Sequence, residues 1–349
     1  MFKLSLIFLL SLILFSCNSK KEETNPKPTE QVSKEVNVYT HRHYETDKEL
    51  FAKFEQETGI KVNVIKADAN ELIARIEQEG ANSPADLLLT VDAGNLWAAK
   101  NKGVSSVVES EILNKNIPAH LRDPENHWFG LTKRARIMVY SKDRFKPKKI
   151  MNYSDLADPI YKGKVLVRPS DNIYNQSLLA SIVSHEGSEK AGQWVKGVVN
   201  NLARKPSGND RDQIKAIALG EGDISIVNTY YIAKMITSDD ELEREAVSKI
   251  SILFPNQDNR GAHINISGGI VLKTAPNREN AIKLLEFLSA KEAQELFADA
   301  NFEYPVNPEV QPKGLLLEWG PFKEDTLNLS ELGKNNLEAV KLFDINGWN

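Results

Sequence analysis

From Val36 onward, short hydrophobic runs alternate with longer segments in which apolar residues recur three and four positions apart. The short runs predict strands at 36–40, 60–65, 86–91, 136–141, 164–169, 222–228, 250–254 and 268–272. The longer segments predict helices at 47–58, 70–79, 92–103, 173–185, 189–200, 210–219, 229–235, 278–288, 291–300 and 330–343. This alternation is typical of an α/β protein built on a mixed, largely parallel sheet.

Local signals fix the ends of several of these elements. Thr46 and Glu49 have capping-box spacing at the start of the first helix, and Gly59 follows its end. The run 86–91 is continuously apolar, as expected of a strand buried on both faces, and Asp92 can cap the helix after it. We therefore expect the first hundred residues to form a β-α-β-α-β-α series.

The length and composition of the chain favour two lobes. At 349 residues it exceeds one ordinary core, and 41% hydrophobic and 26% charged residues describe a folded globular protein. The net charge is −4, with acids and bases mixed along the chain and no basic stripe. Nucleic-acid binding is therefore excluded as a function class.

The first residues predict export. Lys3 precedes an apolar run from Leu4 to Phe15 that is too short for a permanent bilayer span, so residues 1–16 are interpreted as a signal peptide. Leu14-Phe15-Ser16-Cys17 resembles a bacterial lipobox, in which the cysteine is acylated. The alternative is plain cleavage near Ser16, because Phe15 is bulky for its position.

The segment after the signal predicts a flexible tether. Residues 17–35 are polar and include two prolines, so they cannot bury enough apolar surface to order themselves. Cys17 is the only cysteine, which excludes an intrachain disulfide. We expect a protein on the periplasmic side, anchored to a bacterial membrane through a lipid at Cys17.

Candidate ligand-binding side chains follow the ends of predicted strands. Open α/β sheets bind ligands at the carboxyl edge of their strands. The residues at such positions are His43, Tyr44, Tyr174, Tyr230 and Tyr231. Each tyrosine has a structural alternative, because paired tyrosines at a strand–helix junction are often packed aromatic residues. His41 and His43 also fit a surface pair.

Tyrosine as a metal ligand favours one kind of ion. A phenol with a pKa near 10 ionises at neutral pH only if a strong positive charge stabilises the phenolate. Phenolate is a hard oxygen donor, which suits a hard trivalent cation. Zinc prefers His, Cys and carboxylate, and calcium prefers carboxylates and carbonyls. Ferric iron is therefore the leading candidate.

Enzymatic motifs are lacking in the sequence. It contains no nucleophile elbow, no His-Glu-x-x-His and no phosphate-binding glycine loop. Ser267-Gly268-Gly269 is interpreted as a turn at a strand edge. We expect no catalytic residue and no enzymatic activity.

Six stretches together resemble the periplasmic ferric-iron-binding proteins of ABC importers. The closest likeness is to the FutA/FbpA-like branch of the extracellular solute-binding protein family 1, and within it to FutA-like members that lack a bound synergistic anion. The likeness covers the chain from about residue 36 to its end. The stretches are Val36–Asp47, Phe51–Ile60, Gly80–Asp86, Leu131–Arg136, Ser170–Ser177 and Asn228–Tyr231.

The resemblance implies a type II periplasmic-binding-protein fold, with two lobes joined by hinge strands around a ligand cleft. The first lobe would comprise residues 36–133 and about 257–307, and the second 134–256 and about 308–349. In such a fold, lobe closure around the ligand is the expected motion.

The resemblance also implies the residues of the site. The iron ligands would be His43, Tyr44, Tyr174, Tyr230 and Tyr231, while His41 falls outside the ligand pattern. Arg42 and Arg134 would line the site and offset the net −1 charge of four phenolates and Fe³⁺.

The implied function is capture of ferric iron and its delivery to an ABC permease in the inner membrane, by a monomer. The alternative is a binding protein of the same fold for another solute, either an organic anion or a polyamine, with the tyrosines as aromatic walls. Preference between Fe³⁺ and Fe²⁺ stays open.

Overall fold

The computed structural model describes residues 34–42, 45–148 and 151–349. The predicted signal peptide, Cys17, nearly all of the tether, His43 and Tyr44 lie outside the described residues. The strands are β1 (Glu35–Thr40), β2 (Lys61–Lys66), β3 (Leu87–Val91), β4 (Phe129–Ser141), β5 (Val165–Leu166), β6 (Ile224–Asn228), β7 (Ile250–Leu253), β8 (Ile264–Val271) and β9 (Tyr304–Pro305).

Most predicted helices form within one or two residues of their expected bounds. The helices of the described residues are α1 (Glu45–Thr58), α2 (Ala69–Glu79), α3 (Ala93–Asn101), α4 (Glu111–Asn116), α5 (Ile173–Glu186), α6 (Ser188–Asn200), α7 (Asp210–Leu219), α8 (Thr229–Ile236), α9 (Glu241–Ser248), α10 (Arg278–Ser289), α11 (Lys291–Asn301), α12 (Gly314–Glu318), α13 (Ser330–Lys334) and α14 (Asn336–Asn346). Of these, α4, α9 and α12 were not predicted from the sequence. None of the helices in the described ranges is long and apolar enough to cross a membrane.

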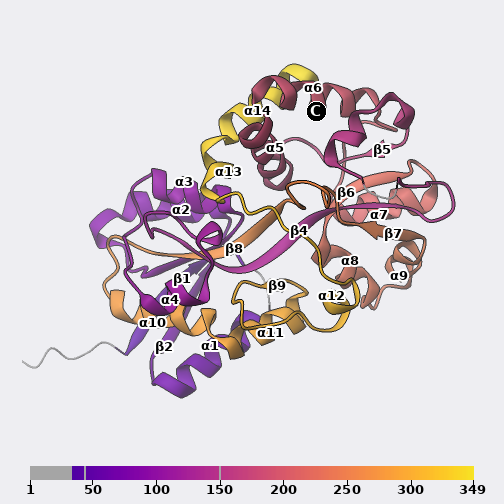
Figure 1. The fold of residues 1–349 in the computed structure, drawn as a ribbon. Helices are drawn as coiled ribbons and strands as arrows, with labels where there is room; N and C mark the ends of the chain where they lie inside the picture. Colours follow the sequence, from indigo (N-terminus) through magenta and orange to yellow (C-terminus); the bar gives the residue numbers. More distant parts are fainter. Residues whose placement is uncertain (1–33, 43–44, 149–150) are drawn as a thin grey trace, which may run out of the picture. The chain divides into compact units, whose positions relative to one another are not determined.

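The strands form a mixed sheet in the order β2-β1-β3-β8-β4-β6-β5, with β7 and β9 also paired to β4. The pairs β1–β2, β1–β3 and β5–β6 are parallel. The strands β4 and β8 are antiparallel to every strand with which they pair. The mixed α/β prediction is therefore confirmed, with the antiparallel pairs concentrated on these two central strands (Figure 1).

The strand β4 pairs with two groups of strands, one along each half of its length. Its first half, from Phe129 to Ala135, pairs with β8 and β9, and its second half, from Arg136 onward, pairs with β6 and β7. The sequence predicted only the second half, because Lys133 and Arg134 interrupt the apolar pattern. These charged residues can lie in the strand because polar side chains from elsewhere in the fold bind them.

The interpretation of Ser267-Gly268-Gly269 as an edge turn was wrong. All three residues lie inside β8, paired with β3 on one side and β4 on the other. A Cβ added to Gly268 would come within 2.6 Å of the carbonyl oxygen of Phe129. Glycine is therefore required here because two backbones approach closely, not because the chain turns.

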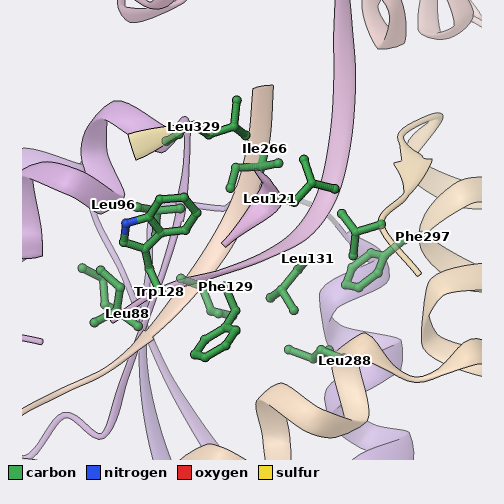
Figure 2. Packing of buried hydrophobic residues seen from close by; sticks show 14 of the residues in the cluster. Leu88, Leu96, Leu121, Trp128, Phe129, Leu131, Ile266, Leu288, Phe297 and Leu329 are labelled. Carbon is green, nitrogen blue, oxygen red and sulfur yellow. The ribbon is translucent and has the colours of Figure 1, made fainter. Parts of the chain in front are cut away.

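Two hydrophobic clusters fill the space between the sheet and its helices. The larger includes residues of β1, β3, β4 and β8 and of the helices packed on them; Figure 2 shows Trp128, Phe129 and Leu131 among its members. The smaller joins α5 and α6 to the C-terminal helix α14 through residues such as Leu179, Trp194 and Phe343. The C-terminal residues are thus part of the core.

The predicted helix 330–343 is divided in two. Asn335 ends α13 and begins α14, and its backbone angles (φ −96°, ψ 4°) are not helical. The short α13 packs against both α3 and α5. Gly333 permits this packing, since a Cβ there would meet Trp97 of α3 at 2.3 Å.

Two consecutive carboxylates before α13 bind histidines from different parts of the fold. Glu324 accepts hydrogen bonds from His120 (3.2 Å) and from Lys133 of β4 (2.6 Å). Asp325 pairs with His185 of α5 (2.8 Å). Burial alone would raise the pKa of Glu324, but His120 and Lys133 outweigh it and lower this pKa to about 2.

The lowered pKa of Glu324 predicts an acid-dependent loss of stability. Its contribution is present above the unfolded-state value of 4.5 and is lost as the pH falls towards 2. Glu324→Gln should reduce the free energy of unfolding by about 1.5–3 kcal/mol at pH 7, and by much less at pH 3. Urea unfolding at both pH values measures this. Glu292→Gln, which removes an exposed pair with Lys53, is the control; equal losses for the two variants would contradict the prediction.

The close approach at Gly268 predicts a second effect on stability. Gly268→Ala should lower the free energy of unfolding by about 1–3 kcal/mol, because neither backbone can move aside without disturbing the sheet. Gly192→Ala, inside α6, is the matched control: its nearest neighbour is a flexible leucine side chain at 3.2 Å, and alanine favours the helix. Chemical denaturation measures both. An unaffected Gly268→Ala variant would refute the backbone-contact explanation.

Candidate functional site

Three of the predicted tyrosines meet at the starts of two helices. Tyr174 lies in the first turn of α5, and Tyr230 and Tyr231 lie in the first turn of α8, directly after β6. The hydroxyl of Tyr230 donates a hydrogen bond to that of Tyr174 (3.3 Å). The rings of Tyr230 and Tyr231 have centroids 4.2 Å apart. The fold thus gathers three phenols that are separated by up to 57 positions in sequence.

The phenol of Tyr174 is held in its neutral form. Burial raises its pKa to about 12; the neighbouring Tyr231 adds to the increase, and Arg134 opposes it. Lys234, one turn further along α8, has its Nζ 5.5 Å from the centroid of the Tyr230 ring. Burial lowers the pKa of Lys234, while Glu303 opposes the decrease.

Three arginines surround the ring of Tyr174. The guanidinium carbons of Arg134, Arg136 and Arg168 lie 5.6, 5.9 and 5.4 Å from its centroid. Arg134 and Arg136 are two apart on β4, so both project to the same face of the strand. Arg134 also donates to Ser267 (3.2 Å) and lies 3.8 Å from Glu303. Positive charge therefore surrounds this phenol on several sides.

A buried carboxylate accepts hydrogen bonds from two of these arginines. Asp210, the first residue of α7, accepts hydrogen bonds from Arg136 (2.9 Å) and Arg168 (3.0 Å). Burial would lower the pKa of Arg168, but Asp210 outweighs it and raises this pKa. Arg136 also donates to Asn175 (2.8 Å) and Asn228 (3.2 Å), so one guanidinium contacts the segments that carry all three tyrosines.

Two of the three tyrosines, Tyr174 and Tyr231, line a cavity of about 960 Å³. Tyr174, Tyr231 and Arg168 line it on one side, and residues of α2, α3 and the α13–α14 junction line it elsewhere. His41 lies at its wall, although the sequence analysis excluded this residue from the ligand pattern. Its ring nitrogen Nδ1 is 3.5 Å from the hydroxyl of Thr90, and its Nε2 is 3.9 Å from Asp68.

Asp92 joins two elements that bound this cavity. It caps α3 by accepting from the backbone N–H of Gly94 (2.9 Å), as the sequence predicted. It also accepts from Ser177 of α5 (2.7 Å) and Asn265 of β8 (2.8 Å). Its φ of 75° is unusual for a residue with a Cβ. Three buried hydrogen bonds hold this conformation.

The other residues predicted for the site are His43, Tyr44 and Arg42. His43 and Tyr44 lie outside the described residues, so the structure neither joins them to the three tyrosines nor separates them. Arg42 is buried; it donates two hydrogen bonds of 3.0 Å to Asp47, and its guanidinium lies over the ring of Phe297.

The sequence analysis missed Arg136, Arg168 and Asp210. One signal was present: Arg136 begins a predicted strand two residues after Arg134, so a strand extended back to Arg134 would place both on the same face. Arg168 had a weaker signal, a charge at the end of a buried strand. Asp210 had none, because its partners are 42 and 74 positions away. In the described part of the chain, no group of three or more His, Cys, Asp and Glu could hold a metal ion.

Comparisons with known proteins place this geometry in a family. Residues 82–323 match the family described as bacterial extracellular solute-binding protein. Iron uptake protein A1 of Synechocystis sp. is 47% identical, over 97% of this chain and 94% of that protein.

Solved structures agree with this assignment. The chain resembles Trichodesmium IdiA (FutA) in complex with iron and citrate, with a TM-score of 0.88 and 48% identity, over 90% of this chain and 100% of that one. It also resembles ferric iron-binding protein A of Mannheimia haemolytica in an open conformation, with a TM-score of 0.86 and 46% identity, over 90% and 99% of the two chains. The fold is that of the type II periplasmic binding proteins, and the chain belongs to the bacterial extracellular solute-binding protein family.

Proposed function

We propose that this protein is the substrate-binding component of an ABC importer and that it captures ferric iron. One observation carries the proposal: Tyr174 and Tyr231 line the cavity, and Tyr230 contacts both of them from directly behind its wall. The relatives named above support it, since they are called iron uptake or ferric iron-binding proteins. The phenolates of the three tyrosines, with Tyr44 and His43, would bind the ion.

The charges around the tyrosines fit a trivalent cargo. Three phenolates balance Fe³⁺, and Tyr44 as a fourth would leave a net charge of −1. The guanidinium groups of Arg134, Arg136 and Arg168 lie close enough to offset it. A ferric ion is a hard cation that prefers such oxygen donors.

Lobe closure would follow from the position of the ligands. We propose that residues 36–133 with about 257–307 form one lobe and that 134–256 with about 308–349 form the other. The boundary at 133–134 falls inside β4, two residues before its pairing passes from β8 and β9 to β6 and β7. Ligands from both lobes would favour the closed form, which a permease in the inner membrane would recognise.

The proposed cellular setting rests on the N-terminal sequence. Acylation of Cys17 after removal of residues 1–16 would anchor the monomer to a membrane, and residues 17–35 would let the folded body reach the permease. The relatives named as solute-binding proteins act in transport, and we propose no enzymatic activity.

Binding of ferric iron should colour the protein. Apoprotein given ferric citrate should turn orange-red through phenolate-to-iron charge transfer, and replacing both Tyr230 and Tyr231 by Phe should abolish the visible band. Tyr140→Phe, on β4 outside the cavity, is the control and should keep it. Retention of colour by the double variant would contradict the proposal, and heat of binding from an organic anion or a polyamine in place of iron would favour the alternative function.

Binding should also release protons. With its pKa raised to about 12, Tyr174 is protonated at pH 7, so coordination must displace its proton. Affinity should therefore rise with pH. Calorimetry of ferric citrate binding in two buffers of different ionisation enthalpy should show about one proton fewer released by Tyr174→Phe than by wild type. Equal proton release would show that Tyr174 does not coordinate the ion.

A further inference from the structure

Asp210 occupies a position between the two segments that carry the tyrosines. It is fully buried at the amino end of α7. One carboxylate oxygen accepts from Arg168, and the other accepts from Arg136 and from the backbone N–H of Asn228 (2.8 Å). None of these hydrogen bonds involves a tyrosine, so any influence of Asp210 on the phenols passes through its partners.

The first path leads to Tyr174. Asp210 fixes the guanidinium groups of Arg136 and Arg168, which lie 5.9 and 5.4 Å from the Tyr174 ring. Arg136 also donates to the side chain of Asn175, the residue next to Tyr174. Asn175 in turn donates to the carbonyls of Arg168 and Pro169 (2.9 and 3.1 Å). The side chain of Asn175 thereby links the first turn of α5 to Arg136 and to the backbone of the segment that precedes the helix.

The second path leads to Tyr230 and Tyr231. Asn228 ends β6 and is the N-cap residue of α8, two positions before Tyr230. Its N–H donates to Asp210, and its side-chain oxygen accepts from Arg136. One carboxylate therefore sets the position of the amino ends of both α5 and α8.

Loss of the Asp210 carboxylate would leave Arg136, Arg168 and the backbone N–H of Asn228 without their shared acceptor. The side chains that flank the three phenols would then lose their common anchor, and iron binding would weaken.

We propose that Asp210 is a positioning residue for the cargo: it holds Arg136, Arg168 and Asn228 so that the three phenols converge on one ion. This inference rests on the proposed ferric function. It assigns to Asp210 a role in affinity without direct contact with the metal, similar to that of outer-shell partners in other metal sites.

The test is Asp210→Asn in the full mature chain, with ferric citrate as the probe. The amide keeps the shape but places an NH₂ group against one guanidinium. We expect ferric binding about 10- to 100-fold weaker than wild type, and a visible band that approaches that of Tyr174→Phe in intensity. Asp212→Asn removes the same charge from the same helix turn, where Asp212 accepts a hydrogen bond from the backbone N–H of Asn209. Its affinity for ferric iron should stay near that of wild type. Unchanged or tighter binding by Asp210→Asn would overturn the inference.

Two further measurements separate positioning from loss of fold. In a Tyr174→Phe background, Asp210→Asn should weaken binding much less than in wild type, whereas a general folding defect would weaken both equally. Arg168→Gln keeps the Arg136–Asp210 pair and serves if Asp210→Asn does not fold. It should weaken binding, and its effect should be less than additive with that of Asp210→Asn.

These experiments also distinguish failure of the inference from failure of the proposed function. A wild-type protein that takes up no iron, or a Tyr174→Phe variant with an unchanged spectrum, would refute the ferric site itself. A coloured wild type, an altered Tyr174→Phe and an unaltered Asp210→Asn would refute only the role of Asp210.

Discussion

The arrangement of the site depends on one continuous strand, β4. Because its residues 129–135 pair with β8 and β9 and its residues 136–141 pair with β6 and β7, a single backbone holds two groups of strands in register. Arg134 and Arg136 lie on either side of this change of partners. The strand that joins the two halves of the fold therefore also carries arginines that lie near the tyrosines. A change in the pairing of β4 would move these arginines.

The buried Arg134 and Arg136 and the partly buried Arg168 would be costly without nearby acceptors, since a buried unpaired charge destabilises a protein by several kcal/mol. Asp210 and Glu303 supply negative charge close to them. The region is nevertheless more positive than negative, three guanidinium groups against two carboxylates among the groups named. A compact apoprotein can hold this imbalance because the guanidinium groups also contact the Tyr174 ring and amide oxygens.

Much of the fold followed from local pattern. The helix Asp210–Leu219 had its predicted bounds, and the apolar run before Asp92 formed the buried strand β3. Pattern failed where a distant partner decides the structure. Lys133 and Arg134 interrupt the apolar pattern of β4. Their partners, Glu324 and Glu303, are about 170 to 190 positions away, so the local sequence does not show that these two charges can lie in a strand. The break at Asn335 likewise depends on Trp97 packing against Gly333. The tyrosines were predictable because strand ends are local; of their three arginines, Arg134 came from the family resemblance, and Arg136 and Arg168 were not predicted.

The neutral state of Tyr174 bears on which cation the site can hold. Ionising a phenol whose pKa is about 12 costs about 7 kcal/mol at pH 7. Under the proposed function the bound ion must return this cost of ionising Tyr174 through electrostatic attraction. A divalent ion has less charge to offer and prefers other donors. Arginines close to the phenols lower the free-energy cost of ionisation but do not remove it. The same burial that keeps the phenol of Tyr174 neutral would therefore favour a cation of high charge.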